Sequence, residues 1–173
     1  KNPLGLSIGT SQLSLKRWQK MFKIKDNFLT KKEFNTLYDN IFNVNSHFPW
    51  FFYDAKEPIK NYKEDLTQYQ FCHIFFNVGI SQSTFYYVIH SLIKKLKIKK
   101  LLRAKLNLNP YSSILSEGFF HTDISNCTTA IFYLNTNDGY TLFKSGKKVS
   151  SKENRLIIFD SNLEHTGTNT TNK

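Results

Sequence analysis

Short runs of β-branched and aromatic residues, separated by turn residues, dominate the second half of this 173-residue sequence. Asn137-Asp138-Gly139 and Ser145-Gly146 are tight-turn sequences between such runs. Many short strands at close spacing are typical of an all-β barrel or of two packed sheets. The pattern predicts a mostly β fold, a double-stranded β-helix or jelly roll. We expect its strands at 101–108, 118–123, 128–134, 140–143, 147–149 and 155–159.

Two amphipathic segments precede these runs. Thr30-Lys31-Lys32-Glu33 is a capping box followed by apolar residues at helical spacing, which predicts a helix over about 30–43. A second helix is expected after Ser81 or Ser83 as N-cap, with an apolar stripe over 85–96 and a lysine-rich C-terminal end.

The segment between the predicted helices begins with the aromatic run 48–53, which we expect to be a strand or wall. The polar stretch 54–70 follows it and indicates a long loop. We therefore expect a single domain over 1–173, with helical support and substrate-side loops in 1–100 and a jelly-roll core in 101–173. The predicted N-terminal helices would pack on that core.

Composition limits the partners and the compartment. The net charge is +11 and the isoelectric point about 9.6, which would suit a nucleic acid. The chain is also rich in Asn, Ile and Phe, which share A/T-rich codons with Lys, so codon bias is an alternative source of this charge. Cys72 and Cys127 are too few for a disulfide framework, and no apolar run is long enough to span a membrane. We expect a reducing, cytoplasmic location, in a cell or a phage-infected host.

His121, Asp123 and His165 are the candidate metal ligands. His121 and Asp123 are two residues apart in a predicted strand, so their side chains would point to the same face. His165 follows the apolar run 155–159 and a turn. Two imidazoles and one carboxylate form a facial triad, the ligand set typical of non-haem iron(II) oxygenases. A closed zinc site would require a fourth ligand, for which Cys127 is the nearby candidate.

The other histidines are expected to have structural or surface roles, because none has a carboxylate at ligand spacing on the same face. His47 precedes Phe48-Pro49, His73 lies in an apolar run, and His90 is in the second predicted helix.

The segment from Ala104 to the end resembles the 2-oxoglutarate/iron(II) oxygenase superfamily, in its prolyl 4-hydroxylase-like branch with many phage and bacterial members. The order and spacing of several short motifs carry the resemblance. These motifs are 105–111 (Lys-Leu-Asn-Leu-Asn-Pro-Tyr), 120–123 (Phe-His-Thr-Asp), 130–135 (Ala-Ile-Phe-Tyr-Leu-Asn), 138–143 (Asp-Gly-Tyr-Thr-Leu-Phe) and 154–160 (Asn-Arg-Leu-Ile-Ile-Phe-Asp) before His165.

The resemblance implies iron(II), 2-oxoglutarate and dioxygen, with ascorbate as a reductant. It also implies that Tyr111 and Tyr133 contact the co-substrate and that Thr141 contacts its distal carboxylate. The family's Arg or Lys that anchors this carboxylate follows the second histidine by nine or ten residues. We expect it beyond Lys173 together with a last barrel strand; Lys173 out of register, or weakened co-substrate binding, are the alternatives.

The expected activity is hydroxylation of an unactivated C–H bond. The favoured substrate is a protein side chain of the prolyl type, and the alternatives are a small metabolite or a modified nucleic-acid base. A non-catalytic jelly-roll module that binds a polyanion through 94–105 is the alternative outside enzymes.

Overall fold

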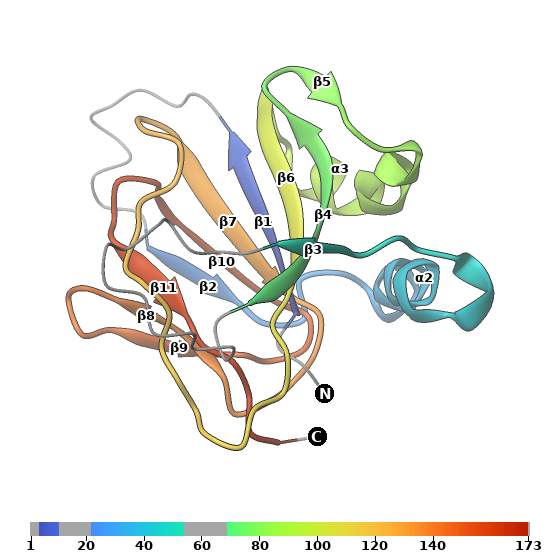
Figure 1. Cartoon of the computed structure of the whole chain (residues 1–173). Coiled ribbons are helices and arrows are strands. Elements are labelled where there is room, and N and C mark those ends of the chain that lie inside the picture. The colour runs from blue at the N-terminus through green and yellow to red at the C-terminus, as the bar shows by residue number, and fades with distance from the viewer. Residues whose placement is uncertain (1–3, 11–21, 54–68, 173) are drawn as a thin grey trace.

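The strands of this chain form two antiparallel sheets, with few helices, in the computed structural model (Figure 1). The structure describes residues 4–10, 22–53 and 69–172. The prediction of a mostly β fold is confirmed. Within the described residues the strands are β1 (Leu4–Thr10), β2 (Lys23–Lys25), β3 (Phe51–Tyr53), β4 (Gln70–Asn77), β5 (Ile80–Ser81), β6 (Leu101–Leu108), β7 (Thr128–Tyr133), β8 (Tyr140–Phe143), β9 (Lys148–Ser150), β10 (Arg155–Asp160) and β11 (His165–Gly167). The helical segments are α2 (Lys31–Phe42), η1 (Val44–Ser46), η3 (Thr84–Ile89) and α3 (His90–Leu96).

The larger sheet has the strand order β2-β10-β7-β1-β6-β4-β3, with β5 paired to β4. Strand β1 lies between β7 and β6 and is antiparallel to both. Strands β7 and β6 are therefore each hydrogen-bonded to β1, one on either side of it. No open sheet edge therefore lies between β7 and β6.

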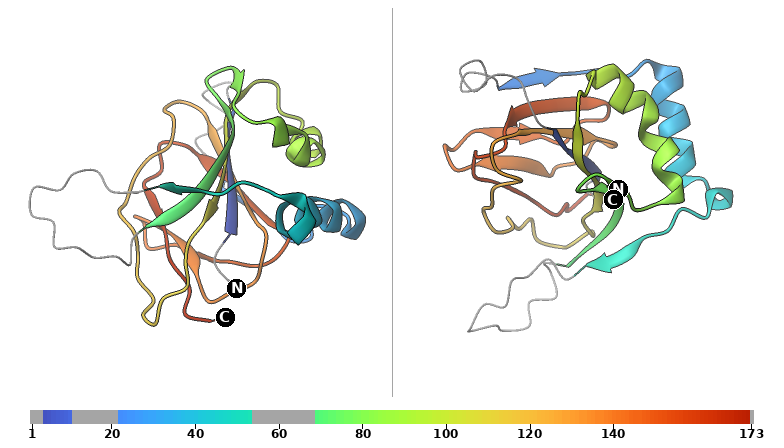
Figure 2. Two further views of the ribbon diagram at one scale, coloured as in Figure 1. Left: turned by 45° about the vertical axis from the view of Figure 1, so that its right-hand side comes forward. Right: turned by 90° about the horizontal axis from the view of Figure 1, so that it is seen from above.

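The smaller sheet has the order β11-β8-β9. It lies against one face of the larger sheet, and an apolar cluster between the two sheets holds them together (Figure 2). Phe143 and Val149 of the smaller sheet contribute to this cluster, together with Tyr133, Ile157 and Phe159 of the larger sheet. The contributing residues of β7 and β10 alternate along each strand, as side chains on one face of a sheet do.

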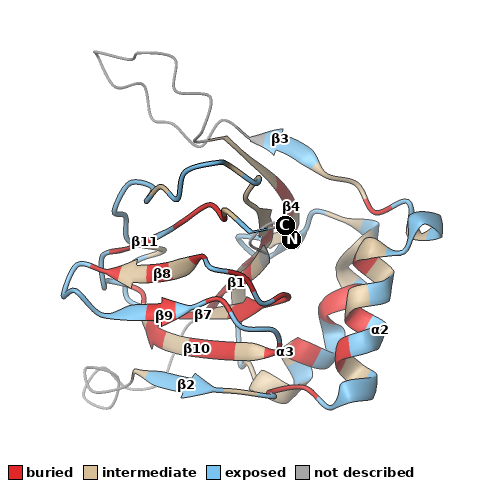
Figure 3. Ribbon diagram, turned by 90° about the horizontal axis from the view of Figure 1, so that it is seen from below, coloured by how far each residue is buried: buried red, intermediate tan, exposed pale blue. Residues whose placement is uncertain are grey.

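The helices cover the opposite face of the larger sheet. Their buried residues turn toward the sheet (Figure 3) and join a second apolar cluster with the other alternate residues of β1, β6, β7 and β10. The buried sheet residues in this cluster are Leu6, Ile8, Phe75, Ala104, Leu106, Ala130, Phe132 and Leu156. The larger sheet is thus buried on both faces, which explains why the runs in β7 and β10 are almost continuously apolar.

The predicted helix over 30–43 is confirmed as α2. Thr30 is its N-cap, and both hydrogen bonds of the capping box form with Glu33. The second predicted helix has Ser83 as its N-cap, but its first part is the 3-10 segment η3 and only its second part is α-helical. No helix among the described residues is long and apolar enough to cross a membrane.

The strand predictions have mixed outcomes. Strands 101–108 and 140–143 form with the predicted bounds. Strands 128–134 and 155–159 differ by one residue at the C-terminal end, and 147–149 is shifted by one residue to 148–150. The predicted strand 118–123 is wrong, because His121 forms only an isolated bridge in an otherwise irregular segment. Strands β1, β2, β4, β5 and β11 were not predicted. The predicted loop over 54–70 lies mostly outside the described residues.

Candidate metal centre

Two backbone hydrogen bonds bring His121 and His165 side by side. The amide of each donates to the carbonyl of the other, at 3.0 and 2.9 Å. The amide of Asp123 donates to the carbonyl of Ser161 at 3.1 Å, which attaches the same segment to the turn after β10. The two histidines are therefore direct neighbours in an isolated antiparallel bridge.

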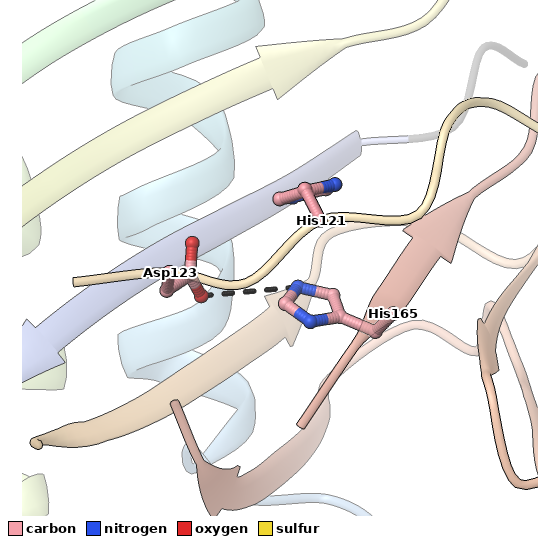
Figure 4. Close-up of side chains that lie close together, drawn as sticks. All are labelled: His121, Asp123 and His165. Atoms are coloured by element: carbon pink, nitrogen blue, oxygen red, sulfur yellow. Dashed lines mark ion pairs between the residues drawn. The ribbon is translucent and has the colours of Figure 1, made fainter. Parts of the chain in front are cut away.

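The side chains of His121, Asp123 and His165 converge on one point (Figure 4). One donor atom from each lies within 4.8 Å of the donor atoms of the others. The Nε2 atom of His165 is 3.8 Å from Oδ2 of Asp123, and the imidazole centroids of the two histidines are 4.6 Å apart. Atoms at this spacing could bind one metal ion together after small shifts.

Both imidazoles are oriented by carbonyl groups of the local backbone. Nδ1 of His165 lies 2.9 Å from the carbonyl oxygen of Leu163, and Nδ1 of His121 lies 3.2 Å from that of Phe119. A carbonyl oxygen can only accept, so each Nδ1 carries a proton, and in the neutral imidazole Nε2 then has the lone pair that a metal would bind. This second-layer bonding is what metal-binding histidines require.

Thr129 holds the carboxylate of the cluster. Its hydroxyl donates to Oδ2 of Asp123 at 2.6 Å from a fully buried position on β7. Asp123 lies on an irregular segment and Thr129 lies on a central strand, so this hydrogen bond fixes the carboxylate relative to the larger sheet. Sequence analysis did not identify Thr129, although its place on the inner face of β7 could have suggested it.

The environment of the cluster favours a neutral, metal-binding His165. Burial lowers the pKa of His165, while its hydrogen bond to Leu163 and the charge of Asp123 raise it to a smaller extent. Phe159 and Phe143 pack against the His165 ring, with centroid distances of 4.9 and 5.9 Å. His121, in contrast, is exposed. The cluster thus has one apolar wall and one side open to a ligand.

The donor set fits a catalytic metal better than a closed structural one. Two imidazoles and a carboxylate supply three ligands, which leaves positions for exogenous molecules on an octahedral ion. Cys127, the candidate fourth ligand, donates its thiol to the carbonyl of Ile124 at 2.7 Å, and burial raises its pKa. It does not join the group of donor atoms that the described residues bring together.

The remaining histidines lie apart from this cluster. His73 is buried, with Nδ1 2.8 Å from the carbonyl of Pro49 and Nε2 2.8 Å from the hydroxyl of Ser83. His90 packs on Tyr86, and His47 is an exposed residue with a left-handed backbone at the end of η1. These positions agree with the structural or surface roles expected from sequence.

The predicted co-substrate residues separate into two groups. The hydroxyls of Tyr133 and Thr141 are 2.7 Å apart in the core between the two sheets. Burial raises the pKa of Tyr133 to about 12, so its hydroxyl remains protonated. Tyr111 instead is 44% exposed, in a segment that pairs with Thr170. The alternative carboxylate anchor Lys173 lies outside the described residues.

Comparisons with known proteins do not identify a family. No protein-family model matches this chain, and no curated protein matches it significantly.

Proposed function

We propose that this chain is a 2-oxoglutarate-dependent non-haem iron(II) dioxygenase that hydroxylates an unactivated C–H bond. The observation that carries the proposal is the convergence of His121, Asp123 and His165, with both Nε2 atoms available and an open side. When bound, the metal with dioxygen and a keto acid supplies the oxidising chemistry. The chain supplies the ligand geometry, an apolar wall and the positioning of the co-substrate.

The scaffold supports this proposal. We infer that the two sheets form a jelly roll, because a larger and a smaller antiparallel sheet enclose a common apolar cluster and the metal ligands lie at its rim. Tyr133 and Thr141 place two buried hydroxyls in that same interior. Such hydroxyls are suitable donors for a co-substrate carboxylate.

A protein side chain is the substrate class that the surroundings of the cluster favour. Phe119, Phe120 and Leu163 are exposed beside the two histidine ligands, and Ile114 is 73% exposed in the preceding loop. An apolar rim of this kind suits a polypeptide segment whose target side chain enters the open side of the cluster. A prolyl-type side chain remains the leading candidate from the resemblance.

Succinate formation tests the proposed activity. Purified protein in air with iron(II) and 2-oxoglutarate should release succinate without the prime substrate, since uncoupled turnover needs only the metal and the keto acid. His165→Ala should abolish both iron binding and turnover, whereas His90→Ala, on an exposed helix position, should change neither. A protein that binds iron but neither binds nor consumes 2-oxoglutarate would contradict the proposal.

A second candidate function follows from the basic surface at the end of α3. Lys94, Lys97, Lys99 and Lys100 are exposed there, just before β6. They favour a polyanion-binding role, with or without catalysis. Binding of duplex and single-stranded DNA across a salt series tests it. An affinity that vanishes at moderate salt, without sequence preference, would leave these lysines a solvating role only.

A further inference from the structure

The turn after β10 has the metal cluster on one side and a cavity on the other. On the cluster side, the carbonyl of Ser161 accepts from the amide of Asp123. The carbonyl of Leu163 accepts from Nδ1 of His165 on the same side. Residues 162–164 also line a cavity of about 290 Å³. One short turn therefore positions metal ligands and forms part of the cavity wall.

The other walls of the cavity are apolar below and basic at the rim. Phe22 and Phe143 form the apolar wall, with their ring centroids 5.0 Å apart. Lys144, Ser145 and Lys147, from the turn between β8 and β9, line the rim. Binding pockets commonly combine apolar walls with a few polar groups that orient the ligand. This combination suits a side chain with an apolar stem and an anionic end.

The rim carries an excess of positive charge. Nζ of Lys144 lies 2.9 Å from Oε1 of Glu164, and these side chains are 62% and 45% exposed. Nζ of Lys147 lies 3.3 Å from the centroid of the Phe22 ring and makes no ion pair with a described carboxylate. The cavity therefore has two ammonium groups against one carboxylate. An exposed ion pair such as that of Lys144 is weak, so an incoming carboxylate can compete for it.

The cavity lies within reach of a polypeptide that occupies the metal cluster. His121 is the bridge partner of His165, and His165 is the strand partner of Phe143. Neighbouring strands are about 5 Å apart, so Phe143 lies about 10 Å from His121. Lys144 also places its Nζ 5.8 Å from the centroid of the Phe120 ring, beside the first histidine. An extended polypeptide rises about 3.3 Å per residue, so this distance corresponds to about three residues.

We propose that this cavity binds an acidic side chain of the polypeptide substrate, about three residues from the side chain that enters the open side of the metal cluster. This inference rests on the proposed function and names its substrate class, an acidic polypeptide segment. The carboxylate pairs with Lys147 and approaches Lys144, and its stem packs on Phe22 and Phe143. The apolar wall favours a carboxylate side chain over a backbone phosphate of nucleic acid, because the phosphate brings no apolar stem to cover the two rings.

Binding of a fluorescein-labelled random copolymer of glutamate, alanine and tyrosine tests the cavity, by anisotropy at about 0.15 M salt. Lys147→Glu should weaken binding about 10-fold or more, because attraction at the rim becomes repulsion. Lys32→Glu makes the same charge change at an exposed position of α2, on the opposite side of the larger sheet (Figure 3). This control should stay within about threefold of wild type, because salt screens a distant charge. Lys147→Gln removes the charge without reversing it and should give an intermediate loss.

The outcomes separate the cavity from the proposed activity. Equal weakening by Lys147→Glu and Lys32→Glu in folded proteins refutes the cavity, since the copolymer would then respond to net charge alone. Wild-type protein that does not bind the copolymer refutes it as well. An equal loss of single-stranded DNA binding in Lys147→Glu overturns the polypeptide assignment. Copolymer binding requires neither iron nor 2-oxoglutarate, so a protein that binds the copolymer through Lys147 but forms no succinate contradicts only the proposed function.

Discussion

Replacing Thr129 by valine tests whether Asp123 is a metal ligand held by the larger sheet. The substitution removes a hydroxyl that donates to Oδ2 of Asp123 at 2.6 Å and replaces it with a methyl group of similar size. A hydrogen bond to a charged group contributes about 1.5–3 kcal/mol. Loss of a hydrogen-bond partner of a metal ligand typically reduces metal affinity about 10- to 100-fold. At about 1.4 kcal/mol per tenfold, this loss corresponds to about 1.4–2.8 kcal/mol, which agrees with the energy of the hydrogen bond.

Anaerobic iron(II) titration by calorimetry measures this effect, with thermal unfolding as the check on folding. Thr128→Val is the matched control, since Thr128 is buried on the same strand and its side chain points to the opposite face. We expect a weaker metal complex for Thr129→Val and an unchanged one for Thr128→Val. Equal iron affinity in the folded Thr129→Val protein would refute the reasoning that this hydroxyl positions the ligand.

Three further predictions concern stability. Gly139→Ala should lower the unfolding free energy by about 1–3 kcal/mol in chemical denaturation, because the new Cβ would lie 2.8–2.9 Å from three oxygen atoms; Gly5→Ala, with its nearest contact at 3.5 Å, should be milder. Thr30→Ala should cost about 1 kcal/mol through loss of the α2 cap, with the exposed mid-helix Thr36→Ala as control. Burial lowers the pKa of His73 below 6.5, so the unfolded chain binds more protons and stability should fall as pH drops below about 6.5. Denaturation from about pH 7.5 to 5.5 checks this, and His73→Gln should reduce the slope.

Local sequence signals predicted the elements that depend on local interactions. The capping box of Thr30 and Glu33 lies within one turn, and it defined the start of α2 correctly. Strands β6 and β8 were predicted with their observed bounds. In β8 the aromatic and β-branched residues lie between clear turn signals, whereas β6 is an alternation of leucine and alanine with polar residues. Ser83, one of the two predicted N-caps of the second helix, is the observed one, but periodicity does not distinguish the 3-10 geometry of η3 from an α-helix.

Elements that depend on distant partners were not predicted. Strand β1 has two glycines in seven residues, which weakens a strand prediction, and its place between β7 and β6 is set by long-range pairing. The segment around His121 was expected to be a strand, yet its backbone pairs with β11 at one bridge only. The three metal-ligand candidates were nevertheless brought together as predicted, because side-chain chemistry identified them independently of the secondary structure.

The lysines of this chain show why a residue count does not identify a ligand site. Codon bias can account for Lys97, Lys99 and Lys100, because an exposed lysine costs the fold little. Lys105 differs from these lysines, because burial lowers its pKa and the charge of Arg103 lowers it further. Its sequence context, alternating with Ala104 and Leu106, resembles any amphipathic strand, so only the burial of both faces of the larger sheet distinguishes it. A count of lysines does not separate this half-buried residue from those that lie in water, so the net charge of +11 identifies no ligand site.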